Sequence, residues 1–147
     1  MKENNFVEKS IAQLKNAGLR ITQPRMFVLE LLSKTTTPLT AHGIHAELVS
    51  NNKSLDLVSV YRILDMLQEQ GLVHRDAENG SYFSCMHCKK CPENTHIFLK
   101  CLDCSSVREL DYHGEVFSTS FKRKLARMKA RPTQELIYLN DLCGSCG

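Results

Sequence analysis

The sequence predicts an α+β protein in which an N-terminal winged helix-turn-helix domain is followed by a small α/β domain. Three observations indicate this fold. Stretches with helical hydrophobic spacing precede residue 72, a short hairpin pattern follows them, and cysteines and histidines dominate the chain after Phe83. The change in composition places a domain boundary near Ser84, which divides the chain into residues 1–84 and 85–147. The chain is long enough for two such domains, because domains usually run about 50 to 200 residues.

Four amphipathic helices are predicted in the first domain, over residues 6–17, 22–33, 40–49 and 56–71. Thr22, Thr40 and Asp56 are N-cap candidates, because their side-chain oxygens can accept a hydrogen bond from the first helical turn. Gly18 and Gly71 follow the first and fourth apolar patterns and favour a helix end. The fourth helix is expected to expose a polar face that can form hydrogen bonds outward, made of Ser59, Arg62, Asp65 and Gln68.

A hairpin is predicted directly after the fourth helix. Residues 72–75 and 81–83 are rich in strand-forming side chains, and Asn79-Gly80 between them is a typical hairpin turn. In the second domain we predict a strand over residues 97–99, a helix from Tyr112 to Lys129 and a further strand over residues 136–139.

The charge of the chain gives no strong indication of a partner. The net charge is +3, with nine Lys or Arg against nine Asp or Glu in residues 1–84 and ten against seven in the rest. Any nucleic-acid contact must therefore depend on where a few cations lie. The basic run between Lys122 and Arg131 is interpreted as the solvated face of a helix.

The cysteines indicate metal binding. No apolar run approaches the roughly 20 residues of a membrane helix, and the first ten residues lack the apolar core of a secretory signal, so we expect a cytoplasmic protein. Thiols stay reduced in the cytosol, where a chain with seven cysteines is more often a metal protein than a disulfide protein.

Two Cys-x-x-Cys pairs lie at opposite ends of the second domain. Each pair can offer two thiolates to one ion, and two pairs complete a tetrahedral site. We therefore predict a structural zinc bound by four cysteines, which would hold the C-terminal segment against the sheet and add folding energy. A pair of disulfides and a thiol-redox motif are the competing interpretations. The four predicted ligands are Cys101, Cys104, Cys143 and Cys146.

Several segments together resemble the ferric uptake regulator family. They are Gly18 to Arg25, Val28 to Leu32, Val58 to Arg62, Gln70 to Val73 and the two cysteine pairs. The resemblance runs from about Lys15 to Cys146 and is closest to the zinc-sensing branch of the family. It implies a homodimer with an α/β dimerisation domain, which represses transcription by binding a palindromic DNA operator when its sensing metal is bound. It implies neither an enzyme, nor a small-molecule substrate, nor a membrane partner.

The resemblance also implies which residues contact DNA. Tyr61 and Arg62 on the fourth helix would face the major groove, with Ser59 on the same helix. Arg20 would reach the minor groove and Arg25 would hold a phosphate. Tyrosine can pack against a thymine methyl group, and arginine can bind phosphate or a guanine edge.

The sensed metal is predicted from how the chain departs from the iron- and peroxide-sensing members. Those members resemble one another in a His-x-His motif, whereas this chain reads His96-Ile97-Phe98 and lacks the second histidine. Phe117 and Glu135 stand at other positions where those members offer ligands. Only part of that iron site is therefore present.

Zinc-sensing members instead resemble this chain in four ligand positions. These positions are His74, Cys85, His96 and Glu109. One thiolate and one carboxylate neutralise a divalent ion, and sulfur with imidazole favours zinc over iron or manganese. We therefore expect a second, regulatory zinc that joins the wing to the second domain. Its binding would fix the angle between the domains, so that two recognition helices meet successive major grooves.

The loop from Cys85 to His96 is about three residues longer than in those zinc-sensing members, and its role is open. Its additional cysteines and histidine, His87, Cys88 and Cys91, are alternative metal ligands in place of His96, ligands of a further ion, or residues of a surface insertion. An iron–sulfur site lacks an obvious fourth ligand. Three further histidines, His42, His45 and His113, are interpreted as surface residues.

Three alternative functions remain at this point. The same scaffold could sense iron, manganese or peroxide. The cysteines could serve a thiol-redox protein, although the sequence shows no signature of a substrate pocket. A zinc-ribbon interaction module without DNA binding is disfavoured by the helix that contains Val58 to Arg62.

Overall fold

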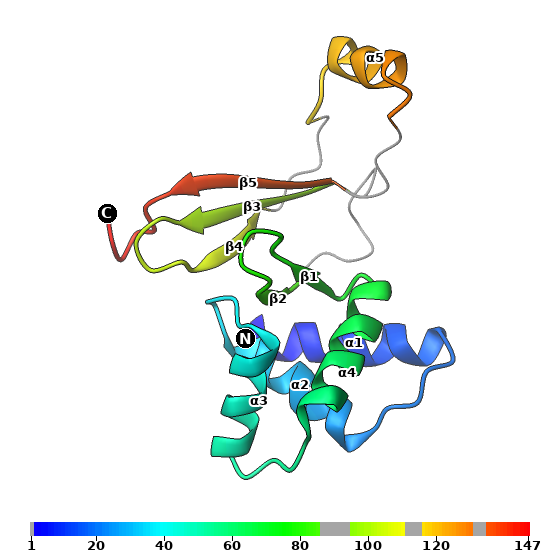
Figure 1. Ribbon diagram of the computed structural model, residues 1–147, viewed down its shortest axis with the longest axis vertical. Helices are drawn as coiled ribbons and strands as arrows, with labels where there is room; N and C mark the ends of the chain where they lie inside the picture. Colours follow the sequence, from blue (N-terminus) through cyan, green and yellow to red (C-terminus); the bar gives the residue numbers. More distant parts are fainter. Residues whose placement is uncertain (1, 86–94, 111–115, 131–134) are drawn as a thin grey trace.

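The computed structural model describes residues 2–85, 95–110, 116–130 and 135–147. Its helices are α1 (Lys2–Asn16), α2 (Gln23–Lys34), α3 (Ala41–Ser50), α4 (Leu57–Glu69) and α5 (Thr119–Arg127). Its strands are β1 (Val73–Arg75), β2 (Tyr82–Ser84), β3 (Thr95–Cys101), β4 (Val107–Leu110) and β5 (Glu135–Asp141). Helices α1 to α4 form one layer, and the β1–β2 hairpin lies between that layer and a three-stranded sheet (Figure 1). The predicted fold class, a winged helix followed by a small α/β domain, is confirmed.

The helical layer is built around one apolar core, and α4 shows why. Its buried residues Val60, Ile63, Leu64 and Leu67 recur every three to four positions, which places them on one face of the helix. They pack with buried residues of the other helices and of the wing, among them Phe6, Leu14, Leu29, Leu32, Ile44 and Leu72. The opposite face of α4 stays at the surface.

Two of the three predicted N-caps form side-chain hydrogen bonds. The Thr40 hydroxyl accepts from the Gly43 N–H at 3.1 Å, and the Asp56 carboxylate accepts from the Ser59 N–H at 2.9 Å. The hydrogen bonds from the Ser59 hydroxyl and the Ser59 N–H lower the pKa of Asp56. Thr22 occupies the N-cap of α2 in extended backbone but makes no side-chain cap bond. Gly71 follows α4 at φ +68°, a conformation that favours glycine.

The wing is the predicted hairpin, with His74 opposite Phe83 in an antiparallel register. The Asn79 side chain accepts from the Ser81 N–H at 2.9 Å, and Gly80 has φ +70°, so the Asn-Gly turn is as expected. Strand β2 of the wing also pairs with the loop before α3, because Leu39 and Tyr82 exchange backbone hydrogen bonds of 3.1 and 2.7 Å.

The three-stranded sheet has the order β4-β3-β5, with β3 antiparallel to β4 and parallel to β5. Strands β3 and β5 contain the predicted strands and are longer than predicted. Strand β4 was not predicted, since Val107-Arg-Glu-Leu110 is short and its apolar residues do not alternate with polar ones. It lies at an edge of the sheet, where pairing to β3 rather than side-chain burial maintains it.

The predicted helix from Tyr112 to Lys129 begins later than expected. Residues 116–118 are not helical, and α5 starts at Thr119. Ser118 is its N-cap, because the hydroxyl accepts from the Phe121 N–H at 3.3 Å. Residues 111–115 lie outside the described part of the chain. Lys129 ends the helix at φ +56°.

The helical layer and the three-stranded sheet also touch at a place outside the wing. The Val107 N–H at the start of β4 donates to the Thr36 carbonyl, at 3.0 Å, in the loop between α2 and α3. The domain boundary near Ser84 stays a prediction. Within the described ranges, none of the helices is both long and apolar enough to cross a membrane.

Candidate metal centres

The parallel pairing of β3 and β5 brings the two Cys-x-x-Cys pairs together. Parallel strands end at the same edge of a sheet, and Cys101 at the end of β3 is in register with Asp141 at the end of β5. Each pair then lies in a tight turn that leaves this edge. The Ser105 N–H donates to the Cys101 carbonyl at 3.1 Å, and the Cys146 N–H donates to the Cys143 carbonyl at 2.8 Å.

The four thiols have the spacing of a tetrahedral zinc site. All four sulfur atoms lie within 4.8 Å of one another, from Cys101, Cys104, Cys143 and Cys146. The Cys104–Cys143 and Cys143–Cys146 sulfur pairs are 3.7 and 3.5 Å apart. Zinc–sulfur bonds of about 2.3 Å in a tetrahedron place sulfur atoms roughly 3.8 Å apart. The residues present therefore fit a zinc ion.

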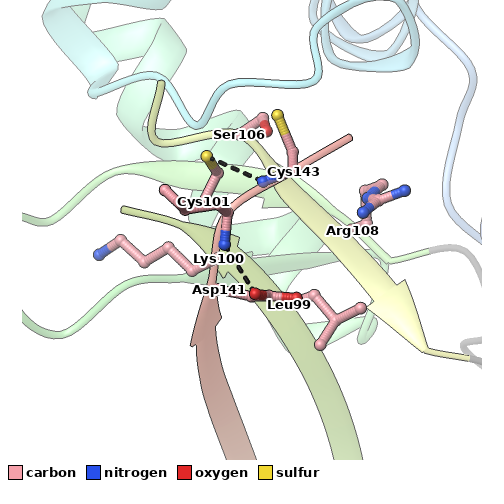
Figure 2. Close-up of a pocket in the computed structure, with 8 residues that line it drawn as sticks. Leu99, Lys100, Cys101, Ser106, Arg108, Asp141 and Cys143 are labelled. Atoms are coloured by element: carbon pink, nitrogen blue, oxygen red, sulfur yellow. Dashed lines mark hydrogen bonds between the residues drawn. The ribbon is translucent and has the colours of Figure 1, made fainter. Parts of the chain in front are cut away.

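Backbone N–H groups prepare this cluster for a cation. The Cys143 N–H donates to the Cys101 sulfur at 3.3 Å, which Figure 2 shows as a dashed line. This bond is the main reason why the pKa of Cys101 falls to about 6. The pKa of Cys146 instead rises to about 12, chiefly through its hydrogen bond with the Cys143 thiol. Without a cation, the cluster retains protons that a bound metal would displace.

A second cluster joins the wing to the sheet. His74 lies on β1 and Cys85 directly follows β2, whereas His96 lies on β3 and Glu109 on β4. The ligand atoms of His74, Cys85 and His96 all lie within 4.8 Å of one another. The Cys85 sulfur is 3.7 Å from His96 Nδ1 and 3.7 Å from Glu109 Oε1. The structure thus brings together the four residues predicted for sensing.

These separations match the needs of a tetrahedral zinc with nitrogen, sulfur and oxygen ligands. Bonds of about 2.0 to 2.3 Å put neighbouring ligand atoms roughly 3.3 to 3.8 Å apart. His96 Nδ1 and Glu109 Oε1 are closer, at 2.7 Å, because they form a direct hydrogen bond. A small rotation of the carboxylate would separate them. The donor set of two imidazoles, a thiolate and a carboxylate therefore also fits zinc.

The second cluster is shielded from water. His74 and Cys85 are 2% and 1% exposed. The centre of the Phe98 ring lies 5.4 Å from that of His74, 4.9 Å from that of Phe83 and 5.6 Å from that of Tyr138. Burial lowers the pKa of His74 to about 4, and repulsion from His96 adds to this effect. His74 is therefore a neutral imidazole at physiological pH, which is the form that binds metals.

Four of the residues singled out from the sequence fall outside the part of the chain that the structure describes. His87, Cys88, Cys91 and His113 lie outside the described residues. The alternative roles proposed for them stay predictions. Among the described cysteines no disulfide is present, and the thiols of the two pairs are the close neighbours noted above.

The exposed face of α4 carries the predicted base-reading residues. Tyr61 is 38% exposed and Arg62 is exposed, on the side opposite the core. The Tyr61 hydroxyl lies 3.5 Å from His42 Nδ1 on α3, with the two rings edge to face. The Ser59 hydroxyl is half-buried and donates to the Asp56 cap at 2.6 Å, so it supports the helix start.

Of the two other predicted DNA contacts, Arg20 lies between α1 and α2, and Arg25 lies in the first turn of α2. Arg20 is exposed, and the Arg25 guanidinium donates to the Arg20 carbonyl. This bond holds Arg25 at the start of α2, where its remaining N–H groups can reach a phosphate. His45 is half-buried on α3.

Sequence reasoning missed the residues that surround the second cluster. From the sequence, Phe98 served only to show that a second histidine is missing. In the structure its ring is fully buried next to His74. Asp76 and Lys100 were not singled out, although they form an ion pair between the wing and the sheet. No motif marks either residue. The ion pair between Asp76 and Lys100 could be predicted only once the position of the wing over β3 was known.

A winged helix joined through a buried cluster of metal-ligand residues to a small α/β domain defines the class of metal-dependent transcription regulators. The chain belongs to the ferric uptake regulator family, whose model matches residues 16–127. The ferric uptake regulation protein of Vibrio cholerae is 30% identical over 137 residues, which cover 91% of this chain and 87% of that protein.

Solved structures with the same fold include zinc uptake regulators. A zinc uptake regulator in complex with zinc and DNA has a TM-score of 0.82 at 24% identity, over 99% of this chain and 95% of that chain. Holo XcZur has a TM-score of 0.79 at 24% identity, over 97% and 96%. Apo XcZur has a TM-score of only 0.51 at 26% identity, over 99% and 97%.

Proposed function

We propose that this protein is a zinc-responsive repressor that binds a palindromic operator as a homodimer. The observation that carries the proposal is the buried cluster of His74, Cys85, His96 and Glu109, because its ligands come from both parts of the molecule. A site shared in this way couples metal binding to the position of the wing. Metal and operator would then strengthen each other's binding by the same factor.

Zinc is the ion that the donor set favours. Sulfur and imidazole ligands select zinc over the harder manganese and iron ions. Phe98 supports this choice, since a phenyl ring buried against Phe83 and Tyr138 stands where the iron-sensing members are expected to have their second histidine. Iron remains the second candidate, because curated relatives of the chain are named ferric uptake regulation proteins.

The mechanism assigns separate tasks to the two halves of the cluster. His74 and Cys85 are the ligands that the wing contributes, whereas His96 and Glu109 are the ligands that the sheet contributes. The four residues would together hold a zinc ion, which would supply the positive charge that draws the wing and the sheet together. Glu109 and the Cys85 thiolate balance its charge inside a buried site. The arrangement of the chain supports this account, because it superposes on holo XcZur better than on apo XcZur, with TM-scores of 0.79 and 0.51.

The four-cysteine cluster is proposed to hold a structural zinc. It joins the turn after β3 to the segment after β5. The second copy of the chain would place another α4 one helical turn of DNA away, where the exposed Tyr61 and Arg62 could read the next major groove. The zinc uptake regulator solved with zinc and DNA supports this arrangement.

Metal analysis tests the proposal most directly. The purified protein is expected to hold two zinc ions per chain, of which mild chelation removes one and abolishes operator binding. Titrating zinc, iron and manganese back into the chelated protein then compares the ions. Restoration by iron or manganese at a lower free concentration than zinc would favour the second candidate. A single zinc ion per chain would contradict the proposed regulatory site.

The DNA face gives a separate prediction. Tyr61→Ala is expected to reduce the preference for operator over random DNA by about 1 to 3 kcal/mol, because a base contact carries the sequence information. Arg25→Ala should weaken binding to both DNAs alike, since it contacts phosphate. Fluorescence anisotropy at fixed zinc and salt measures both. Equal losses on the two DNAs for both variants would show that Tyr61 does not read a base.

A further inference from the structure

An ion pair between the wing and the sheet contains none of the proposed metal ligands. Lys100 Nζ on β3 is 3.0 Å from the Asp76 carboxylate, in the turn of the wing, and 3.2 Å from the Glu78 carboxylate. The Asp76 side chain is 4% exposed and that of Lys100 is 18% exposed, whereas that of Glu78 is 83% exposed. Asp76 is therefore the buried partner of the pair, and Glu78 is a solvated one.

The Asp76 carboxylate is held rigidly before it meets Lys100. Its Oδ1 accepts from the Glu78 N–H at 3.0 Å, while Oδ2 faces the Lys100 amine. The Asp76 backbone also pairs with Ser81 at 2.8 Å and with Gly80 at 2.8 Å across the turn. The Asp76 carboxylate therefore loses little conformational entropy when it pairs with Lys100. The ion pair should contribute more net stabilisation than a pair of exposed, freely rotating side chains.

The pair connects the two strands that carry the histidines of the proposed sensing site. Asp76 lies two residues after His74, at the end of β1. Lys100 lies four residues after His96 on β3, and since side chains alternate along a strand both project from the same face of the sheet. Figure 2 shows the Lys100 side chain leaving β3 on the side away from Arg108.

We infer that Lys100 and Asp76 are positioning residues that hold the wing against the sheet before metal binds, and so set the zinc concentration at which the protein responds. This inference rests on the proposed function. The pair lies outside the ligand set and keeps His74 close to His96 when the site is empty. A larger fraction of the metal-free protein is then ready to bind, and the apparent affinity for zinc rises in proportion to that fraction.

Three variants test this inference. Lys100→Met removes the amine and keeps the length of the side chain. Asp76→Asn removes the charge but keeps Oδ1 as the acceptor for the Glu78 N–H, so the turn is retained. Glu78→Gln is the matched control, since its carboxylate is solvated. The three are compared for zinc affinity against a chelator of known strength, for zinc-dependent operator binding, and for small-angle scattering of the chelated protein.

Lys100→Met and Asp76→Asn are each expected to need roughly tenfold more free zinc for half-maximal operator binding, equal to about 1.4 kcal/mol, with parent affinity for DNA at saturating zinc. The chelated variants should be more extended than the chelated parent. The double variant should lose no more than either single variant, because the two residues act as one pair. Glu78→Gln should stay within about twofold of the parent.

Parent-like zinc thresholds in both Lys100→Met and Asp76→Asn would overturn the inference. A loss in Lys100→Met alone would also overturn it, since it would indicate damage to β3 next to Cys101 rather than loss of the pair. If zinc does not control operator binding by the parent, the proposed function fails. In that case the zinc affinity measured against a chelator and the scattering of the chelated protein still test the ion pair. If both are the same in the variants as in the parent, the inference is rejected.

Discussion

Cys101→Ser is expected to remove the tightly held zinc and to leave a poorly folded, largely monomeric protein. The four sulfur atoms lie within one coordination sphere, and their N–H···S hydrogen bonds favour the thiolate at Cys101. Structural zinc sites contribute roughly 10 to 16 kcal/mol of apparent binding free energy at neutral pH, which exceeds the total stability of a small domain. Zinc content after desalting, size-exclusion chromatography and thermal unfolding measure the three losses.

Leu102→Ala is the matched control for this variant. Leu102 is 67% exposed in the same turn and leaves all four thiols in place, so zinc content and dimer should be unchanged. Cys143→Ser should behave as Cys101→Ser does. A stable Cys101→Ser dimer with the zinc content of the parent would reject the four-cysteine assignment.

Cys85→Ser is expected to keep a dimer with one tight zinc per chain, yet to need at least about 100-fold more zinc to bind operator. A neutral hydroxyl is a poor zinc ligand beside a thiolate. Losing even a partner that only orients a ligand costs about 10- to 100-fold, and losing the ligand itself should cost more. The fold should survive, because the four-cysteine cluster is intact. Operator binding at buffered zinc concentrations measures the effect.

Cys91→Ser serves as the control for loss of a cysteine and is expected to respond to zinc as the parent does. The prediction for Cys85 fails if Cys85→Ser responds like the parent while Cys88→Ser or Cys91→Ser does not. That result would move the sensing role to the insertion between Cys85 and His96.

Local chemistry made much of the fold predictable. The i, i+3, i+4 spacing in α4 and the caps at Thr40 and Asp56 depend only on neighbouring residues, so they could be inferred directly. The same holds for the Asn79-Gly80 turn. The four-cysteine cluster was predictable for a different reason, since two Cys-x-x-Cys pairs limit the chemistry even when the sheet that joins them is unknown.

The features that were missed depend on contacts between distant segments. Strand β4 exists because β3 offers it an edge, and its own residues do not indicate a strand. Helix α5 begins at Thr119 because Ser118 caps it, whereas the apolar spacing alone extended the pattern to Tyr112. Lys100 and Asp76 meet only once the wing lies over the sheet. The ligands His74, Cys85, His96 and Glu109 were chosen by resemblance to the zinc-sensing members, through the spacing from His74 to Cys85 and from Cys101 to Glu109, and not from their own chemistry.

The parallel pairing of β3 with β5 also sets an order of events during synthesis on the ribosome. Strand β3 cannot gain this neighbour until the chain has been made as far as Asp141, and the thiol of Cys101 meets Cys143 only after 42 further residues. Helices α1 to α4 have their core partners much earlier, because those contacts lie within residues 6–82. The nascent chain should therefore complete its helical layer first and its sheet last. Until then, the four thiols already synthesised from Cys85 to Cys101, together with that of Cys104, are open to oxidants and stray metal ions.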